Sequence, residues 1–159
     1  MSDSVVMQLE PMRLEDLDEV LYIEHASFPS PWSRNMFLEE MDNRNSRLVV
    51  FKMERLVIGY ICFWVVLDEA HILNIAVHPE KKHQGVGLLM MAELEALCVK
   101  EGLKRVILEV ARKNIAARGL YRKCGFRSVG FRKNYYSITK DDALIMEKYL
   151  QPPDSDARS

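Results

Sequence analysis

Apolar residues recur along the first part of the chain in a pattern that predicts a strand followed by two helices. Val5–Leu9 alternates weakly between apolar and polar positions, which indicates a strand, whereas Leu14–Ala26 repeats apolar residues at helical spacing. The segment 28–33 (FPSPWS) contains two prolines and should end this helix. Ser33 can then cap a second helix that runs to about Met41.

Continuous runs of valine, isoleucine and phenylalanine predict three strands in the middle of the chain. Arg47–Met53 and Leu56–Leu67 are separated by only two residues, which indicates a hairpin. His71–Val77 is a further apolar strand, and Pro79 ends it.

The second half of the chain alternates helical and strand patterns. We expect a helix over 88–102 closed by Gly102, a strand over 104–111, a short helix over 114–123, and strands over 126–131 and 144–149. Strands mixed with helices predict one α/β domain over residues 1–150. The polar segment 151–159, which contains two prolines, is expected to be a disordered tail.

Composition narrows the class of protein. The 159 residues carry a net charge of −1 and three widely spaced cysteines, so no disulfide framework is indicated, and we expect a reducing, cytoplasmic compartment. The first residues lack the basic and apolar regions of a secretory signal. The longest apolar run, Leu56–Leu67, is too short for a membrane helix, so no membrane association is expected.

Charge is unevenly distributed along the chain. Residues 1–45 hold ten acidic side chains and three basic ones, whereas residues 112–133 hold eight basic side chains and no acidic one. This division is compatible with two ligands of opposite charge, but also with ordinary solvated surfaces. A nucleic-acid-binding module is not favoured, because only one segment is basic and the whole chain is slightly acidic.

The most informative junction lies between the strand at 71–77 and the helix at 88–102. The intervening loop contains Gly85 and Gly87, which let a ligand approach the backbone closely, and the amides at a helix start favour an anion. The amides of 84–88 would form a cradle for a pyrophosphate, with positive charge from Lys81, Lys82 and His83 at its rim. The spacing matches neither the dinucleotide fingerprint nor the Walker pattern, so a plain flexible turn stays open on this evidence alone.

Two further side chains are candidates for chemistry. Glu109 stands between Leu108 and Val110 in an apolar strand, so it faces either water at a sheet edge or a cleft, where it would suit a general base. Tyr121 lies about two helical turns beyond Asn114, a potential helix cap, on the same helix face. A core tyrosine with a satisfied hydroxyl is the simpler reading of Tyr121.

Together these features resemble the GCN-five-related N-acetyltransferase (GNAT) superfamily. Its phosphate signature, Gln/Arg-x-x-Gly-x-Gly/Ala, corresponds here to Lys82-His-Gln-Gly-Val-Gly, with lysine in place of glutamine or arginine. The motifs PWS, VVLDEA, NIAV, LEV, N-x-x-A-x-x-L-Y-x-x-x-G-F and RKNYY resemble, more narrowly, the bacterial ribosomal-protein-alanine N-acetyltransferases. Enzymes of that type acetylate the N-terminal alanine of a small-subunit ribosomal protein.

The resemblance implies a fold, a co-substrate and a set of site residues. The fold is a mixed, mostly antiparallel central sheet flanked by helices, in which a splayed strand pair forms the acetyl-coenzyme A (acetyl-CoA) cleft. Glu109 becomes the general base and Tyr121 the general acid. The implied acetyl-CoA contacts are Ile75, Ala76, Val77, His83, Gln84, Gly85, Val86, Gly87, Leu88 and Asn114. No metal is expected, because the histidines and cysteines lack metal-ligand spacing.

The expected acceptor follows from the same resemblance. The ribosomal acceptor is basic, which the acidic N-terminal half and Glu69 would suit, and Tyr135 and Tyr136 could close over a bound peptide. We therefore expect a cytoplasmic enzyme that acetylates an N-terminal alanine, with neither nucleic acid nor membrane as a direct partner. Two alternatives stay open: a related enzyme that acetylates lysine side chains, polyamines or another small amine, and a non-catalytic acetyl-CoA sensor.

Overall fold

The structure is a computed structural model that describes residues 6–136 and 141–151. The chain forms two compact units: unit 1 comprises Met1–Phe63 and Asn74–Met90, and unit 2 comprises Trp64–Leu73 and Met91–Ser159. Three elements contribute residues to both units: β3 (Leu56–Val66), β4 (Glu69–Val77) and α3 (Val86–Lys100). The single domain expected over residues 1–150 stays a prediction, and the predicted tail lies, from residue 152 onward, outside the described residues.

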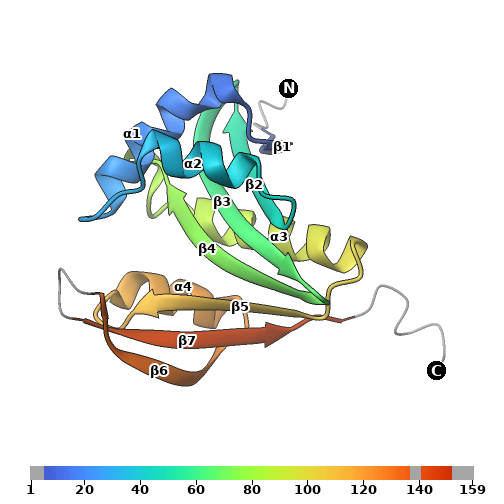
Figure 1. The fold of residues 1–159 in the computed structure, drawn as a ribbon, viewed down its shortest axis with the longest axis vertical. Coiled ribbons are helices and arrows are strands. Elements are labelled where there is room, and N and C mark those ends of the chain that lie inside the picture. Colours follow the sequence, from blue (N-terminus) through green and yellow to red (C-terminus); the bar gives the residue numbers. More distant parts are fainter. Residues whose placement is uncertain (1–5, 137–140, 152–159) are drawn as a thin grey trace. The chain divides into compact units, whose positions relative to one another are not determined.

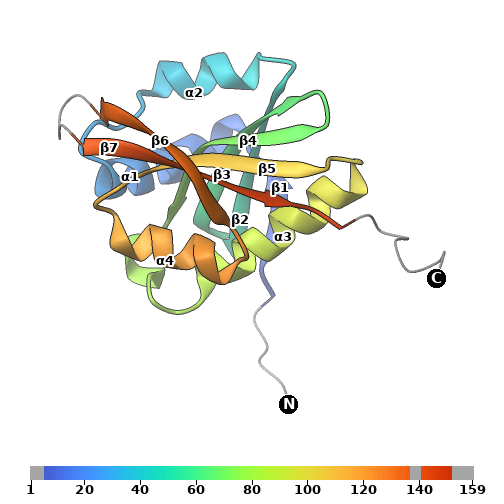
Figure 2. The same ribbon diagram turned by 90° about the horizontal axis from the view of Figure 1, so that it is seen from below.

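Unit 1 is a sheet with helices on both faces. Its strands follow the order β1-β2-β3-β4, and β1 pairs with β2 in the antiparallel sense. Helices α1 and α2 cover one face, and α3 begins on the other (Figures 1 and 2). The remaining elements of unit 1 are β1 (Gln8–Pro11), a 3₁₀ turn (Leu14–Asp16), α1 (Leu17–Ser27), α2 (Arg34–Met41), β2 (Ser46–Met53) and a second 3₁₀ turn (Pro79–Lys81).

Two local features fix how unit 1 packs. Glu54 and Arg55 both have positive φ (52° and 71°), as a two-residue hairpin turn between β2 and β3 requires. Gly59 of β3 allows close packing, because a Cβ there would lie 2.5 Å from Met90 Sδ and 2.9 Å from the carbonyl oxygen of Ala76. The core contains apolar residues from both helices and the strands, including Leu17, Val20, Ile23, Phe37, Val50, Tyr60 and Cys62.

Unit 2 is built on β5 (Arg105–Ala111), β6 (Arg127–Tyr136) and β7 (Asp141–Tyr149), with α4 (Ile115–Lys123) on one face (Figures 1 and 2). The strand order is β4-β5-β7-β6, and β7 is antiparallel to both of its neighbours. Residues Glu69–Ile72 of β4 pair in parallel with Arg105–Leu108 of β5. The register of this parallel pair ends there, although both strands continue.

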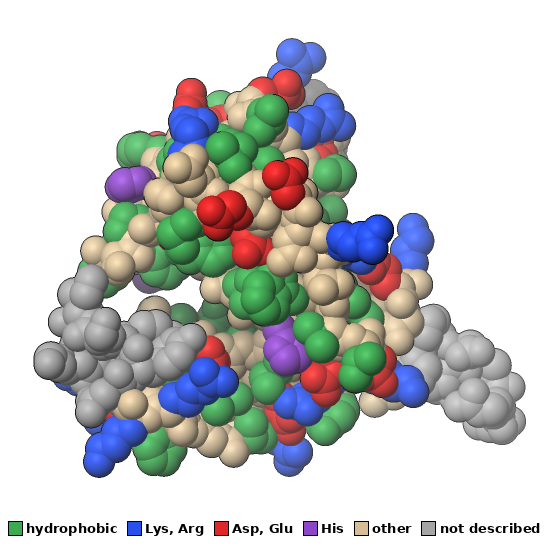
Figure 3. All heavy atoms as spheres, viewed as in Figure 1, with side chains coloured by type: hydrophobic (Ala, Val, Ile, Leu, Met, Phe, Trp, Pro, Cys, Tyr) green, Lys and Arg blue, Asp and Glu red, His purple; other side chains and the backbone are tan. Residues whose placement is uncertain are grey.

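The two faces of β5 differ in character. Val106, Leu108 and Val110 are buried, whereas the residues between them are half-exposed. The half-exposed face carries Arg105 and Glu109, and Figure 3 shows acidic and basic side chains mixed over the visible face of unit 2. One face of this sheet therefore belongs to the core and the other is open to polar chemistry.

Most elements lie where the sequence placed them, with differences at their ends. Leu14 belongs to the 3₁₀ turn and is 68% exposed, so it is not part of the apolar stripe of α1 as predicted. Strands β6 and β7 are longer than the apolar runs at 126–131 and 144–149. The extra residues are largely charged or polar, and backbone pairing does not require apolar side chains.

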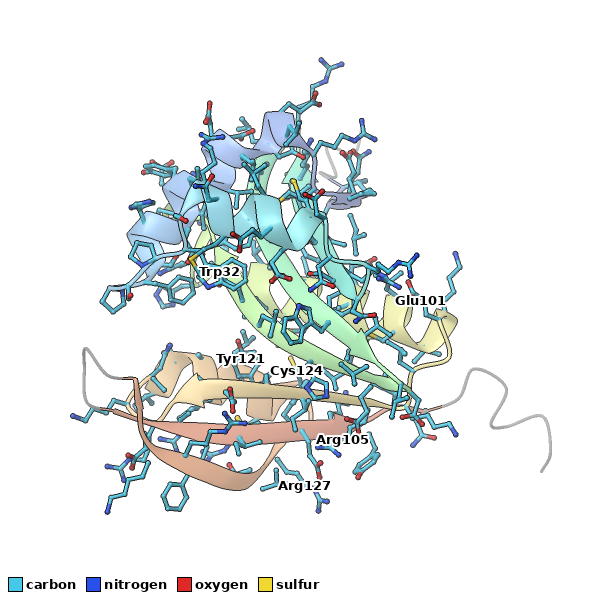
Figure 4. All side chains as sticks on the ribbon, viewed as in Figure 1. Trp32, Glu101, Arg105, Tyr121, Cys124 and Arg127 are labelled. Atoms are coloured by element: carbon cyan, nitrogen blue, oxygen red, sulfur yellow. The ribbon has the colours of Figure 1, made fainter. Side chains whose placement is uncertain are left out.

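A buried carboxylate organises the centre of unit 1. Glu24 of α1 is 1% exposed and accepts three hydrogen bonds. Its Oε1 accepts from the Tyr60 hydroxyl and from Asn74 Nδ2 (2.8 Å), and its Oε2 accepts from the Trp32 backbone N–H (2.8 Å). Burial and the nearby carboxylate raise the pKa of Tyr60, so its hydroxyl remains a donor. Glu24 thus joins α1 to β3, β4 and the connection before α2, where Figure 4 labels Trp32.

Glu24→Gln should destabilise the protein by roughly 1–3 kcal/mol. All three partners of Glu24 are donors, and an amide nitrogen in place of one oxygen would leave at least one buried donor unsatisfied. Urea unfolding measures the change. Glu19→Gln is the matched control on the same helix, because Glu19 accepts one bond, from the Val57 N–H at 3.0 Å, which a glutamine oxygen can replace. Equal, small losses for both variants would contradict this account of Glu24.

Candidate active site

The connection between β4 and α3 is fixed by hydrogen bonds within unit 1. His78 caps the second 3₁₀ turn, its Nδ1 accepting from the Glu80 N–H at 3.1 Å. The Gln84 side chain donates to the carbonyl oxygen of Glu80 at 3.0 Å. His83 and Gly85 both have positive φ, at 63° and 80°. The loop therefore enters α3 through two residues in the left-handed region, of which only one is glycine.

The first turn of α3 presents unpaired amide donors. The Leu89 N–H donates to the carbonyl oxygen of Gly85 at 3.2 Å, as in a regular helix. The N–H groups of Val86, Gly87 and Leu88 come before that bond and have no acceptor within the helix. These donors and the helix dipole favour an anion at this end of α3. The predicted phosphate cradle thus lies on a fifteen-residue helix.

Space is available at this helix end. A Cβ built on Gly85 would meet no atom within 4 Å. His83, Gln84 and Gly85 are exposed, and among the cradle residues only Val86 is buried, at 6% exposure. Exposed donors beside open space can accommodate the diphosphate of a nucleotide-based co-substrate.

The predicted contacts on β4 divide between two faces of the strand. Ala76 is buried at 7% exposure and packs in the core of unit 1, and its carbonyl oxygen faces Gly59. Ile75 and Val77 are half-exposed on the opposite face. Asn74, directly before them, is held by Glu24. Unit 1 therefore brings together Ile75–Val77 and the loop residues predicted to bind the co-substrate.

Glu109 lies on the half-exposed face of β5, with 27% of its side chain accessible. Its Oε2 forms an ion pair with Arg132 Nε of β6 at 2.9 Å. The carboxylate is thus partly open to solvent and lies beside a cation, not in an apolar pocket. Sequence alone could not identify this partner, because the two residues are far apart in the chain.

Tyr121 and Asn114 both belong to the helix α4 segment. Asn114 caps the helix, its Oδ1 accepting from the Ala117 N–H at 3.1 Å, as predicted. Tyr121 is 5% exposed, and its ring lies 5.9 Å from that of Phe126, centroid to centroid. The tyrosine ring therefore packs in the core of unit 2, and Figure 4 labels Tyr121 in α4 and Cys124 directly after that helix. Unit 2 holds both proposed proton-transfer residues, Glu109 and Tyr121.

Glu69, the substrate residue predicted from the charge pattern, has partners within the protein. Glu69 Oε1 lies 3.1 Å from His71 Nε2, and Glu69 Oε2 accepts from Arg105 Nη1 at 3.1 Å. The side chains of Tyr135 and Tyr136 lie outside the described residues. Glu69 therefore belongs to an ion-paired surface and is not an isolated negative charge.

The acidic excess of residues 1–45 is also partly used inside unit 1. Glu10 and Asp16 both pair with Lys52, at 3.3 and 2.9 Å, and Asp18 pairs with Arg34. With Glu19 and Glu24, at least five of the ten acidic side chains bind groups of this chain. The charge count therefore overstates the attraction that unit 1 offers to a basic peptide.

Sequence reasoning missed Glu24, although a signal was present. The residue stands on the apolar stripe of α1, one turn after Val20, where an unpaired carboxylate would be costly to bury. A charged residue at such a position should have been expected to collect donors from other elements.

The cysteines do not have the properties of nucleophiles. All three are free; Cys62 and Cys98 are fully buried, and burial raises the pKa of both thiols to about 12. Burial also raises the pKa of the half-buried Cys124 thiol. Thiols held in the protonated form are weak nucleophiles. Within residues 6–136 and 141–151, no cluster of three histidine, cysteine, aspartate or glutamate side chains could hold a metal.

Comparison with known proteins identifies the family. The family model described as "Acetyltransferase (GNAT) family" matches residues 17–126, which is more than half of the chain. The chain belongs to the GNAT acetyltransferase family. The mixed sheet flanked by helices that the sequence predicted is confirmed, and the protein is an acetyl-CoA-dependent N-acetyltransferase.

Several relatives of this GNAT chain have related names. A Bacillus subtilis (strain 168) protein, provisionally named a ribosomal protein bS18-alanine N-acetyltransferase, is 41% identical over 85% of this chain and 90% of its own length. The Escherichia coli (strain K12) enzyme with that name is 33% identical, over 87% and 94%. The crystal structure of the ribosomal-protein-S18-alanine N-acetyltransferase from Escherichia coli aligns with a TM-score of 0.84 and 29% identity, covering 92% of this chain and 95% of that one.

A second solved structure, Ard1 from Thermoplasma volcanium, aligns with a TM-score of 0.83 and 25% identity, covering 91% of this chain and 98% of that one. Among the helices of the part of the GNAT chain that the structure describes, none is long and apolar enough to cross a membrane.

Gly85→Ala should weaken acetyl-CoA binding to this GNAT protein. Alanine at a φ of 80° is strained by about 1–2 kcal/mol, so the loop should leave the conformation that presents the α3 amides. Gly102→Ala is the matched control, because Gly102 has the same φ and its Cβ would also meet nothing within 4 Å. Calorimetry should show a weaker Kd for Gly85→Ala only, with similar losses of stability. Equal affinities for the two variants would place the phosphate cradle elsewhere.

Proposed function

We propose that this protein transfers the acetyl group of acetyl-CoA to the α-amine of an N-terminal alanine, in a ribosomal protein of the small subunit. The observation that carries the proposal is the similarity, at 41% and 33% identity over most of the chain, to proteins named for that reaction on ribosomal protein bS18. The predicted site residues support an acetyl transfer, because exposed amide donors at a helix start, a carboxylate and a tyrosine are all present. Free thiols agree with action in the cytoplasm, which we also propose.

The co-substrate fits the residues of unit 1. The amides at the start of α3 would hold the diphosphate, and Lys82 and His83 are exposed at its rim. The half-exposed face of β4 at Ile75 and Val77 would contact the pantetheine arm. When bound, acetyl-CoA supplies an activated thioester carbonyl, and a backbone N–H on that strand would stabilise the developing oxyanion.

The residues of unit 2 would move the protons. A peptide α-amine has a pKa of about 7.7–8.0, so the Glu109 carboxylate can take its proton, directly or through water. The amine nitrogen then bonds to the acetyl carbon as the carbon–sulfur bond breaks. Tyr121 gives its hydroxyl proton to the departing thiolate and is reprotonated from solvent, which receives the second proton that the nitrogen loses as the amide forms. The proton held by Glu109 also returns to solvent. The amine attacks the thioester directly, so no covalent intermediate with the protein is required.

Other acceptors are conceivable within the same fold, and structural likeness does not select among them. Solved neighbours include chimeras of a spermidine N-acetyltransferase at 19% identity, which share the fold alone. A lysine side chain, with a pKa of about 10.4, would demand a stronger or better desolvated base than an α-amine. The half-exposed, ion-paired Glu109 fits the easier of these two proton transfers.

A panel of amines tests the acceptor. We expect peptides with a free N-terminal alanine to be acetylated faster than the same peptides with a blocked N-terminus and an internal lysine, and faster than polyamines. Fragmentation in the mass spectrometer locates the acetyl group. Faster acetylation of lysine or of a polyamine would overturn the proposed acceptor, and no transfer to any amine would favour an acetyl-CoA sensor.

Glu109→Gln should reduce turnover of the alanine peptide by roughly 10²–10⁴-fold near neutral pH, with acetyl-CoA affinity preserved. Rising pH should restore part of the activity, because an α-amine with a pKa of about 7.7–8.0 then loses its proton unaided. Tyr121→Phe should behave differently. It removes the group that protonates the departing thiolate, so alkaline pH should not rescue it. Steady-state kinetics from about pH 6 to 10 (roughly two units on either side of the amine pKa) measures both variants. Near-parent turnover of Glu109→Gln at neutral pH would mean that Glu109 is structural.

A further inference from the structure

Glu109 is held by an arginine that reaches it from two strands away. We propose that Arg132 is a positioning residue, which fixes the Glu109 carboxylate in the orientation that takes the proton of the amine. The proposal rests on the proposed role of Glu109 as general base. Its direct observation is the ion pair between Arg132 Nε and Glu109 Oε2 at 2.9 Å.

The strand register explains why these two side chains meet. Arg132 of β6 is paired with Ala143 of β7, and Ala143 is paired with Ala111 of β5. Directly paired residues point to the same face of a sheet, and so do residues two apart in one strand. Glu109 is two residues from Ala111, so it lies on the same face as Arg132.

The residue between them is small. Neighbouring strands are about 4.8 Å apart, so β6 and β5 are separated by about 10 Å across β7. Only two long side chains can close that distance. Ala143, fully buried between the two strands, places no more than a methyl group in their path. The strand register and the small residue together allow Arg132 and Glu109 to pair across β7.

An ion pair at this place has a consequence for catalysis. A half-exposed glutamate on an open sheet face samples several rotamers, and the guanidinium restricts the carboxylate to one of them. A base held in one orientation meets a correctly placed amine more often than one that changes rotamer, so Arg132 should act on kcat.

A comparable pair on the same sheet provides a control. Arg127, also on β6, donates to Glu147 Oε2 from Nε at 3.2 Å and from Nη2 at 2.9 Å. Glu147 is itself bound by Arg105 Nε at 3.1 Å, so Arg127 pairs with a carboxylate other than Glu109. Arg127 thus resembles Arg132 in strand, exposure and type of partner, but it has no assigned part in the reaction.

The first test is kinetic. Arg132→Leu should lower kcat for an alanine-first peptide by roughly 10–100-fold and leave the KM for acetyl-CoA unchanged, because only the base is misplaced. Arg132→Lys should recover much of the loss, since it restores a cation. Arg127→Leu should stay within about twofold of the parent. If Arg132→Leu proves unstable, Arg132→Gln replaces it on this exposed strand. A parent-like kcat for a folded Arg132 variant would overturn the proposal.

The second test is a double-mutant cycle with Glu109→Gln. If Arg132 acts through Glu109, then Arg132→Leu should cost nothing further, within about twofold, once Glu109 is glutamine. The same 10–100-fold loss in both backgrounds would show that Arg132 acts independently and would overturn the proposal. Parent-like turnover of the single variant Glu109→Gln would show that Glu109 is not the base. That result would overturn the proposed base first, and the positioning role of Arg132 with it.

Discussion

Unit 1 depends on one buried carboxylate. Glu24 cannot be placed in an apolar core without donors, and its three donors come from β3, β4 and the chain before α2. Each donor is buried or half-buried with Glu24, so the loss of any one of these hydrogen bonds would destabilise the protein. Because Asn74 directly precedes Ile75–Val77, the same interaction fixes the strand residues that we propose to contact the co-substrate. The packing of α3 against Gly59 of β3 then fixes the start of α3, where we propose that the amides bind phosphate.

The chemistry is divided between two kinds of environment. The proposed cradle uses backbone amides, which a helix end provides at fixed positions whatever its side chains are. The proposed acid and base are side chains, and each is held differently. Tyr121 is fixed by core packing against Phe126, whereas Glu109 is fixed on an open face by Arg132. Tyr121, as the proposed acid, has to keep its hydroxyl proton until the thiolate leaves, and burial favours the protonated form. Glu109, as the proposed base, has to exchange its proton with solvent. The difference in environment therefore suits the two proposed roles.

Much of the fold and of the family could be read from the sequence, because local signals carried both. The Ser33 and Asn114 caps and the turn at Gly102 are confirmed, since each acts within one helical turn of its position. The features that were not predicted depend on long-range contacts. Glu24 was not recognised as a buried carboxylate, the pairing of Glu69 with Arg105 was not foreseen, and no partner was named for Glu109. Their partners come from parts of the chain that are distant in sequence. The left-handed conformation of His83 was not predictable either, because histidine, unlike glycine, rarely adopts a positive φ.

Acetylation of the N-terminal alanine of a small-subunit ribosomal protein changes the mass of that protein by one acetyl group. Its intact mass can be measured after isolation from cells of the source organism with and without the gene for this chain. We expect the protein from deleted cells to lack one acetyl group at its N-terminus, and we expect the parent chain to restore it whereas Glu109→Gln does not. An unchanged N-terminal acetyl group in the deleted cells would contradict the proposed function.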